Sequence, residues 1–415
     1  MMKRGVMLLL VSCYWVMGVR AQLSNYVKKE TAEIRSVQLS DTDWTDLAAF
    51  AAAVKDKRVV MLGEQTHGDG TTFALKARLV RFLHEKMGFN VLAFESDFIS
   101  FSAYEQVRDS ATSSRFIADN LMEIWTGCKT VSHFFTGYLP SQVSGSRPLL
   151  VAGFDTQLHG ALIRKTNKDS LISAWEKATD ISLTISKRGF AARWMDSLSS
   201  FGIAQQTDSL VALQQILDRF EMKLPKRRNQ LMQWCASVNG EVRNRIRYSK
   251  KEQLYYYRDQ QMADNLSWLL KEKYAGEKVI IWAHSAHIAR YPFDASLEQI
   301  GKAAMMGNFL AADSSIRAQS YVVGVTSFSG VSAWAKTNRY DIKINEPPRD
   351  GFERWIPNEY PFAFTDFTKW IRSGGNIAEK FSMKGSIYSH HQNVSLSWLR
   401  VFDGMLFVRN MEGCR

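Results

Sequence analysis

The sequence predicts an α/β fold in which a mostly parallel sheet is flanked by helices and carries a large helical insertion. Six short apolar runs have the composition of buried strands, and they cover residues 58–63, 91–94, 149–154, 279–283, 321–325 and 405–408. The insertion is predicted between the third and fourth runs, because residues 160–272 show only the apolar spacing of helices. The prolines expected to mark loops in the final third are Pro292, Pro347, Pro348, Pro357 and Pro361.

The first two runs are predicted to form neighbouring parallel strands. The segment between them, residues 73–87, alternates apolar and basic side chains with the spacing of an amphipathic helix that packs on a sheet. A strand, a helix and a second strand within about 40 residues form a unit whose strands normally run parallel. We therefore expect these two strands to be adjacent in the sheet.

The composition is that of a globular protein. Of the 415 residues, 46% are apolar and 23% are charged, with 25 Gly and only 8 Pro, which disfavours disorder, collagen and coiled coil. The formal net charge is +12, but the densest basic cluster, residues 223–251, lies in a helical stretch. We interpret it as a solvated helix face, so no nucleic-acid partner is expected.

The N-terminus has the order of a secretory signal. Lys3 and Arg4 precede an apolar run over residues 6–18, and we take Ala21 as the last signal residue. The run is shorter than the ~20 residues that span a bilayer. The mature chain is therefore predicted to be exported, periplasmic or secreted, with no membrane span; a lipoprotein anchored through Cys13 is the alternative.

The cysteines of the mature chain are few and widely separated. They are Cys128, Cys235 and Cys414, a pattern that excludes a paired metal or redox motif and allows at most one disulfide. Cys235 falls in a helical apolar spacing, so we interpret it as a core residue. Which of the three are paired is left open.

Chemically active side chains follow four of the six runs. They are Glu64 and His67 after the first, Glu95 after the second, Asp155 after the third, and His284 with His287 after the fourth. In open α/β sheets the site lies beyond the carboxyl ends of the strands, so these residues are expected to share one cleft. Helix capping by the carboxylates and a structural histidine pair are the simpler alternatives. The other histidines, His84, His133, His159, His390 and His391, are expected on the surface or in loops.

These groups favour hydrolysis by water. A neutral imidazole can take a proton from water near pH 7, and a carboxylate on its other nitrogen fixes the tautomer. His67 can supply the imidazole, and Glu64 and Glu95 can supply the carboxylate. The sequence contains no Gly-x-Ser-x-Gly motif, so it does not support a serine nucleophile. Water would then attack directly or through a metal. We expect no metal or other cofactor, although a divalent ion is the open alternative.

At these residues the sequence resembles the erythromycin esterase family. Residues 63–68 are similar to its Gly-Glu-x-Thr-His-Gly signature, and residues 89–95 to the strand that carries its second glutamate. Residues 153–155 resemble its Gly-Phe-Asp turn, residues 258–265 the helix before the last motif, and residues 282–287 its Trp-Ala-His-x-x-His segment. The likeness extends from about residue 40 to about residue 410, which is nearly the whole mature chain.

The resemblance implies opening of the macrolactone ester of 14-membered macrolide antibiotics. The implied catalytic residues are Glu64, His67, Glu95, His284, His287 and Lys76, and the implied substrate-binding residues are Asp155 and Arg258. Lys76 stands where the family commonly has arginine, which provides a bidentate fork that lysine lacks. Two alternatives stay open: hydrolysis of another ester or peptide, in some relatives linked to polysaccharide metabolism, and a catalytically silent binding protein.

The helical insertion is expected to form one wall of the cleft, because both of its ends emerge near the site. A bulky apolar substrate needs a broad, partly apolar pocket, which Trp234, Met262 and the Tyr255–Tyr257 run could line. Packing of these side chains inside the insertion is an equal alternative. The expected partner is a small-molecule ester, and a monomer is favoured.

Overall fold

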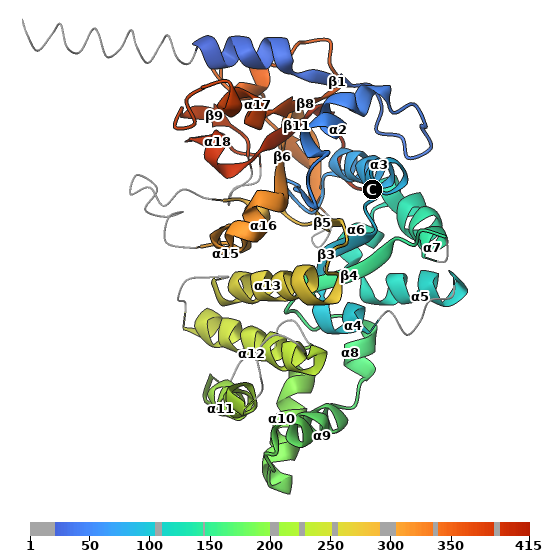
Figure 1. The fold of residues 1–415 in the computed structure, drawn as a ribbon, viewed down its shortest axis with the longest axis vertical. Helices are drawn as coiled ribbons and strands as arrows, with labels where there is room; N and C mark the ends of the chain where they lie inside the picture. Colours follow the sequence, from blue (N-terminus) through green and yellow to red (C-terminus); the bar gives the residue numbers. More distant parts are fainter. Residues whose placement is uncertain are drawn as a thin grey trace, which may run out of the picture.

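The computed structural model describes residues 21–103, 110–143, 146–199, 207–223, 229–250, 256–290, 304–334, 339–385 and 391–415. The expected signal segment lies outside these residues except for Ala21, which is the first described residue of a helix that covers residues 21–30 (Figure 1). That helix is anchored to the domain, because Leu23 and Val27 are fully buried and Tyr26 donates a hydrogen bond to the backbone of Asp366.

A mostly parallel sheet forms the centre of the fold, and all six apolar runs lie in it, as predicted (Figure 1). Its strands are β1 (Ala32–Ile34), β2 (Val59–Leu62), β3 (Val91–Asp97), β4 (Leu150–Asp155), β5 (Val279–Trp282), β6 (Ser320–Trp334), β7 (Arg339–Ile344), β8 (Phe362–Asp366) and β11 (Gly404–Met411). Their order is β1-β8-β11-β6-β2-β5-β3-β4, with β7 paired to β6 alone. A separate two-stranded sheet joins β9 (Phe381–Met383) and β10 (Val394–Leu396).

The first two predicted strands are not neighbours, which corrects the sequence interpretation. β5 lies between β2 and β3 and runs parallel to both, so that Ile280 pairs with Val60 on one side and with Leu92 on the other. The chain enters the position between β2 and β3 only after the helical insertion. A local strand-helix-strand pattern cannot indicate that a strand so distant in sequence will pair there. The histidines after β5 therefore lie between Glu64, which follows β2, and Glu95, which lies near the end of β3.

Three strands of the large sheet were not expected from the sequence. β1 and β8 pair antiparallel at one side of the sheet, and β7 pairs antiparallel with the C-terminal part of β6. β8 begins directly after Pro361, one of the prolines that mark loops. Pro292 lies outside the described residues.

Alternate residues of the parallel strands face two different cores. Met61 and Ile281 belong to the core that also contains the helical insertion, whereas Val60, Ile280 and Leu92 belong to the core on the opposite face. Alternation of this kind explains why these strands are apolar at every position. The two faces are covered on one side by the insertion and on the other by α2 (Ala48–Val54) and α3 (Gly70–Met87).

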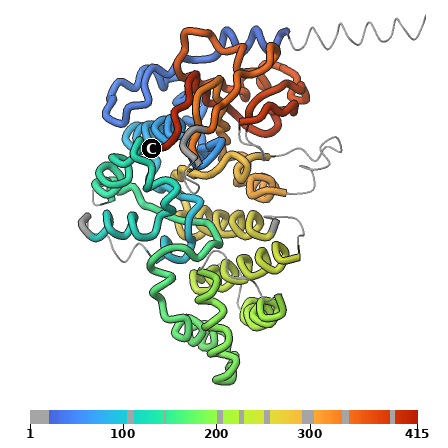
Figure 2. The backbone as a smooth tube through the Cα atoms, turned by 180° about the vertical axis from the view of Figure 1, so that it is seen from behind, coloured from blue at the N-terminus to red at the C-terminus, as the bar shows by residue number. Residues whose placement is uncertain are grey.

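Only helices and short turns are described between β4 and β5. They are α8 (Ala161–Lys165), α9 (Lys168–Thr179), α10 (Ile185–Ser197), α11 (Thr207–Lys223), α12 (Gln230–Ser249), α13 (Tyr256–Trp268) and the π-helix η5 (Leu269–Lys273). α13 packs on β4, α12 packs on α13, and α11 packs on α12, so the insertion extends away from the sheet (Figures 1 and 2).

Short helices connect the remaining strands. They are α4 (Phe98–Ser102), α5 (Ser110–Asn120), α6 (Glu123–Thr126), α7 (Leu139–Gln142), α14 (Ser285–Ile288), α15 (Met306–Ala312), α16 (Ser314–Gln319), α17 (Phe367–Arg372) and α18 (Trp398–Val401). Single turns lie at η1 (Thr45–Leu47), η3 (Lys129–Val131), η4 (Phe134–Tyr138) and η7 (Phe352–Arg354). Among the described residues, no helix is long and apolar enough to cross a membrane.

One disulfide joins Cys128 to Cys414, and Cys235 is a buried free cysteine of the core, as its spacing predicted. The expectation for the remaining histidines was wrong at His84, which is buried on α3 and bonds the backbone oxygen of Phe89. His391 lies in the turn before β10, as expected, although its side chain is only 8% exposed. His390 lies outside the described residues.

Candidate active site

The residues predicted for the site form one continuous network beyond the carboxyl ends of β2, β3, β4 and β5. We describe it as two centres. The His67 centre comprises Glu64, His67, Lys76 and Trp125, and the His287 centre comprises Glu95, Asp155, Arg258, Asp259 and His287. His284 lies between them, with its ring centroid 5.2 Å from that of His67 and 6.2 Å from that of His287.

Glu64 is the anchor of the His67 centre. Its side chain is fully buried; Oε1 accepts from His67 Nδ1 at 2.8 Å and from Trp125 Nε1 at 3.0 Å, and Oε2 accepts from Lys76 Nζ at 2.6 Å. Burial alone would raise the pKa of Glu64, but Lys76 and His67 outweigh it and lower the pKa to about 2. Glu64 is therefore ionised and has donors on both oxygens.

His67 is held as the tautomer that a general base requires. Because Nδ1 donates to Glu64, the lone pair lies on Nε2. The side chain is 31% exposed, and Nε2 has no partner in the described part of the chain. A water molecule from solvent can thus reach the basic nitrogen.

Lys76 lies on α3 beneath Glu64 and is fully buried. Its Nζ also lies 3.4 Å from the backbone oxygen of Ala283 and 4.4 Å from the ring centre of Trp282. Burial lowers the pKa of Lys76 to about 8, although Glu64 opposes this shift. The cation that holds Glu64 in place therefore titrates near neutral pH.

The His287 centre is a buried ion-pair network. Arg258 bonds both oxygens of Asp155, at 2.9 and 2.7 Å, and donates to Glu95 at 2.9 Å. Asp155 is fully buried and Arg258 is 5% exposed. Burial would raise the pKa of Glu95, but His287 and Arg258 outweigh it and hold the pKa well below its usual value. Asp155 and Arg258, predicted to bind substrate, here bind each other.

His287 is an imidazolium in this network. Its Nδ1 donates to Asp259 Oδ1 at 2.7 Å. Burial would lower the pKa of His287, but Asp259 and Glu95 outweigh it and raise the pKa to about 10. Nε2 lies 3.2 Å from both Glu95 Oε1 and Arg258 Nη1. Because a guanidinium cannot accept a hydrogen bond, the protonated nitrogen donates to Glu95.

His284 bonds the backbone through both ring nitrogens. Its Nδ1 accepts from Ala286 N at 3.1 Å, and its Nε2 donates to the backbone oxygen of Gln65 at 3.0 Å. Burial, together with His67 and His287, lowers the pKa of His284 to about 3. The ring is neutral and links the loop after β2 to the start of α14.

The sequence matches the erythromycin esterase family over residues 84–411. The chain belongs to this family. The matched range contains Glu95, Arg258 and His287, whereas Glu64 and His67 precede it. Membership gives the coarse activity, that of an erythromycin esterase-like hydrolase.

Two curated relatives are distant members. The putative hydrolase YbfO of Bacillus subtilis is 25% identical over 395 residues, covering 88% of this chain and 86% of the relative. Erythromycin esterase type II of Escherichia coli is 23% identical over 379 residues, covering 77% and 80%.

Solved structures share the fold. A Bacillus cereus protein superposes with a TM-score of 0.70 at 15% identity, covering 95% of this chain and 98% of that one. A succinoglycan biosynthesis protein gives 0.66 at 15% identity, covering 96% and 99%. A mutant of the erythromycin esterase EreC in its open conformation gives 0.65 at 17% identity, covering 93% and 98%.

Two members of the site were missed by sequence reasoning. Asp259, which orients His287, directly follows Arg258 in the segment that resembles the family, and this adjacency was the available signal. Trp125 lies on α6 in a stretch without any recognisable pattern, so no signal pointed to its bond with Glu64. No group of three or more histidine, cysteine, aspartate or glutamate side chains is arranged to hold a metal ion within the described ranges.

The structure decides one of the side chains for which wall lining and internal packing were equal alternatives. Met262 is a fully buried core residue, so it packs inside the insertion. Trp234 donates to Ser102 Oγ at 2.6 Å, and the ring of Tyr257 lies against Arg247. Tyr255 lies outside the described residues.

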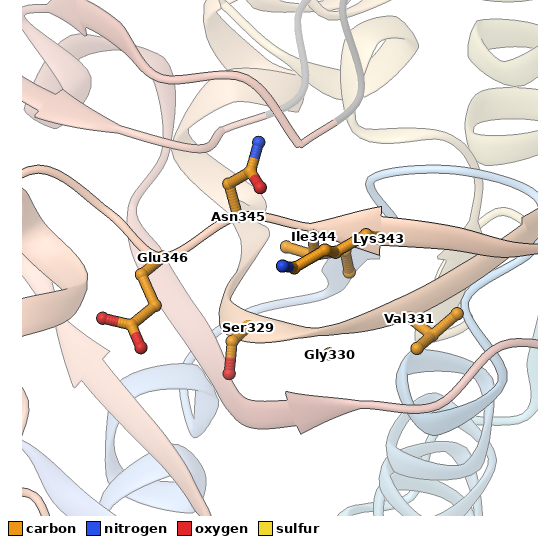
Figure 3. Close-up of a pocket in the computed structure, with 7 residues that line it drawn as sticks. All are labelled: Ser329, Gly330, Val331, Lys343, Ile344, Asn345 and Glu346. Carbon is orange, nitrogen blue, oxygen red and sulfur yellow. The ribbon is translucent and has the colours of Figure 1, made fainter.

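A cavity of about 580 Å³ lies on the β6–β7 hairpin (Figure 3). Its lining residues are Ser329, Gly330, Val331, Lys343, Ile344, Asn345 and Glu346, none of which was predicted for the erythromycin esterase-like site. The hairpin is tied to the loop after β2, because Ser332 Oγ donates to Asp69 at 2.7 Å.

Proposed function

We propose that this protein is a carboxylic ester hydrolase in which His67 is the general base, and that it opens the macrolactone of 14-membered macrolides. The observation that carries the proposal is the pair formed by His67 and Glu64. An ionised, buried carboxylate fixes Nδ1, and the exposed Nε2 is left to accept a proton. No serine or cysteine nucleophile is needed.

The proposed reaction begins with a water molecule next to His67 Nε2. The imidazole takes a proton while the oxygen of water attacks the ester carbonyl, and the tetrahedral intermediate then expels the alkoxide. The imidazolium of His67 returns its proton to that alkoxide, so the lactone opens to a single molecule that carries a new carboxylic acid and a new hydroxyl group. Glu64 stabilises the imidazolium that forms between the two steps.

Glu95 supports the reaction differently in this proposal. It accepts from the backbone N–H of His284 and from Arg258, and it does not bond His67. Glu95 therefore keeps the His287 centre and the start of α14 in place, and Glu64 alone orients the base.

The macrolide assignment draws on the E. coli relative and on EreC, whose names state that they are erythromycin esterases. Hydrolysis of another ester or peptide is the second candidate. It is favoured by Lys76, since lysine offers one point charge where the family commonly has a bidentate arginine.

Export is part of the same proposal. The secretory pattern of the N-terminus is supported by the disulfide between Cys128 and Cys414, because such bonds persist mainly in oxidising compartments. The helical insertion is proposed to wall the cleft, since α13 carries Arg258 and Asp259 into the site.

The test is incubation of purified protein, residues 22–415, with erythromycin. A product heavier by one water supports the macrolide assignment, and its disappearance in His67→Ala assigns the chemistry to this site. A panel of aryl, sugar and lactone esters run in parallel separates the two candidates. Activity should survive exhaustive chelation; loss that zinc or manganese restores would contradict direct attack by water. Turnover of no ester at all would overturn the function.

A further inference from the structure

The carboxylate of Asp69 does not cap helix α3, although Asp69 occupies the N-cap position. Asp69 is the N-cap residue of α3, where an aspartate ordinarily accepts from a backbone N–H of the first turn, but its side chain makes no such bond. Instead, Oδ1 accepts from Ser332 Oγ at 2.7 Å and from His391 Nε2 at 3.1 Å. The carboxylate thus joins the loop after His67 to β6 and to the segment between β9 and β10.

These contacts lie in the interior. Asp69 and Ser332 are fully buried, and the side chain of His391 is 8% exposed. A buried carboxylate needs hydrogen-bond partners, and Oδ2 of Asp69 has none within the described part of the chain. Ser332 and His391 are therefore the side chains that hold this carboxylate.

His391 continues the chain of hydrogen bonds to Ser327, whose Oγ lies 3.1 Å from Nδ1. Serine, histidine and aspartate in this order form the arrangement that activates a serine nucleophile in hydrolases. Ser327, however, is fully buried, so an ester carbonyl cannot reach its Oγ. The arrangement is a structural link, and its effect must act through the neighbouring loop.

The loop between His67 and α3 is fixed from other sides as well. The backbone oxygen of Gly68 accepts from Ala333 N at 3.2 Å and from Cys414 N at 2.8 Å. A Cβ atom at Gly68 would lie 1.5 Å from the backbone oxygen of Ala333, so the loop lies directly on β6. Gly68 is fixed by backbone hydrogen bonds. Asp69 adds the side-chain hydrogen bonds that join this loop to Ser332 on β6 and to His391.

We propose that Asp69 is a positioning residue that acts through His67, an inference that rests on the proposed role of His67 as the base. By binding Ser332 and His391, Asp69 holds the loop in the conformation in which His67 Nδ1 meets Glu64. Without Asp69, Nδ1 leaves Glu64 and the imidazole populates both tautomers. Only one of them has its lone pair on the exposed Nε2.

The test compares Asp69→Ala with a matched control, Asp97→Ala. Asp97 is also buried and also follows a site residue by two positions, but it caps α4 through Ile99 N and Ser100 N. Asp69→Ala should lower kcat by up to about 100-fold, the scale of a small misplacement of a catalytic group, with KM nearly unchanged. Asp97→Ala should lower Tm and leave kcat nearly unchanged.

A second readout needs no substrate. In ¹⁵N-histidine NMR spectra, assigned with His67→Gln, the wild-type ring should be mainly the Nδ1–H tautomer. Asp69→Ala should give a mixture, Ser332→Ala an intermediate spectrum, and Asp97→Ala the wild-type spectrum. If Asp69→Ala does not fold, the His67 spectrum of Ser332→Ala tests the inference in its place.

An unchanged His67 spectrum in the folded Asp69 or Ser332 variant overturns the inference, and so does an equal change in Asp97→Ala. A tautomer shift in a protein that hydrolyses no ester would reject the proposed function and keep the positioning role.

Discussion

The His67 centre and the His287 centre contain the same pair, an imidazole whose Nδ1 is bonded to a buried carboxylate, yet they have different surroundings. His67 is 31% exposed and its Nε2 has no hydrogen-bond partner among the described residues, whereas His287 is 10% exposed and its Nε2 lies next to Glu95 and Arg258. A carboxylate behind an imidazole therefore does not define a base. What lies at the second nitrogen decides whether the ring moves a proton or holds a charge.

The charges of the two centres differ in the same way. In the His67 centre the single carboxylate of Glu64 is matched by the ammonium of Lys76. In the His287 centre three carboxylates face one arginine, and the proton on His287 supplies the second positive charge. His287 thus acts as a counter-ion that helps to join α13 to the sheet.

Replacing each histidine should separate these roles, and the largest effect is expected at His67. His67→Ala should reduce turnover by about 100-fold or more, since a lost general base costs roughly 10²–10⁴-fold. Tm should stay close to that of the wild type, because the side chain is partly exposed. Steady-state kinetics and thermal unfolding measure both. Wild-type turnover in the variant would remove His67 from the mechanism.

His287→Gln should act chiefly on stability. The substitution leaves Glu95 and Asp259 buried without their shared cation, and breaking a buried pair costs about 3–5 kcal/mol. Denaturant unfolding measures the loss, with Lys271→Gln, at an exposed ion pair to Asp313, as the control that should cost under about 1 kcal/mol. A stable His287→Gln protein with abolished turnover would instead make His287 a catalytic residue.

The pH dependence of stability gives a smaller and independent signal. The pKa of His287 is raised from 6.5 to about 10, so its stabilising contribution is complete below pH 6.5 and falls as the pH rises towards 10. Lys76, with its pKa lowered to about 8, has the opposite effect above pH 8. Between pH 6.5 and 8 the free energy of unfolding should therefore fall by up to about 1.4 kcal/mol per pH unit. The slope should be absent in His287→Gln; an identical slope there would refute the assignment.

Lys76→Arg should have the smallest effect and concerns the His67 centre alone. In the wild type the ammonium of Lys76 loses its proton above pH 8, and Glu64 keeps only His67 and Trp125 as donors. We expect kcat/KM to decline about tenfold there, the scale of one charge-assisted hydrogen bond. Arginine stays protonated, so a folded Lys76→Arg protein should lack this decline. The same alkaline decline in both proteins would exclude Lys76 as its cause.

Much of the fold could be predicted because buried parallel strands are apolar at every position. The runs that became β2, β3, β4 and β5 needed no partner to be recognised. The position of β5 could not be predicted, since it depends on where the chain returns after the long helical insertion between β4 and β5. Short strands such as β8 were also missed, because the few residues that follow Pro361 are too short a run to show the apolar pattern of a strand.

The candidate site divides along similar lines. Residues that end strands, such as Glu64, Glu95 and His284, were found from position, because strand ends meet at one edge whatever the strand order. Asp259 and Trp125 reach the site from helices, and their contacts depend on how those helices pack. The position of a histidine after a strand also could not predict that His67 would be partly exposed to solvent and His287 buried among charged side chains.

The disulfide between Cys128 and Cys414 makes a covalent ring of residues 128–414 in the unfolded chain. Its two sulfurs are 286 residues apart in sequence, and closing a loop of that length removes enough chain entropy to favour the folded state by about 5 kcal/mol. The ring contains β4, the helical insertion, β5 and β6, whereas β2 and β3 lie outside it. Material produced with these thiols reduced should therefore unfold at a lower temperature, although the fold of each part and the histidines of the site would be the same.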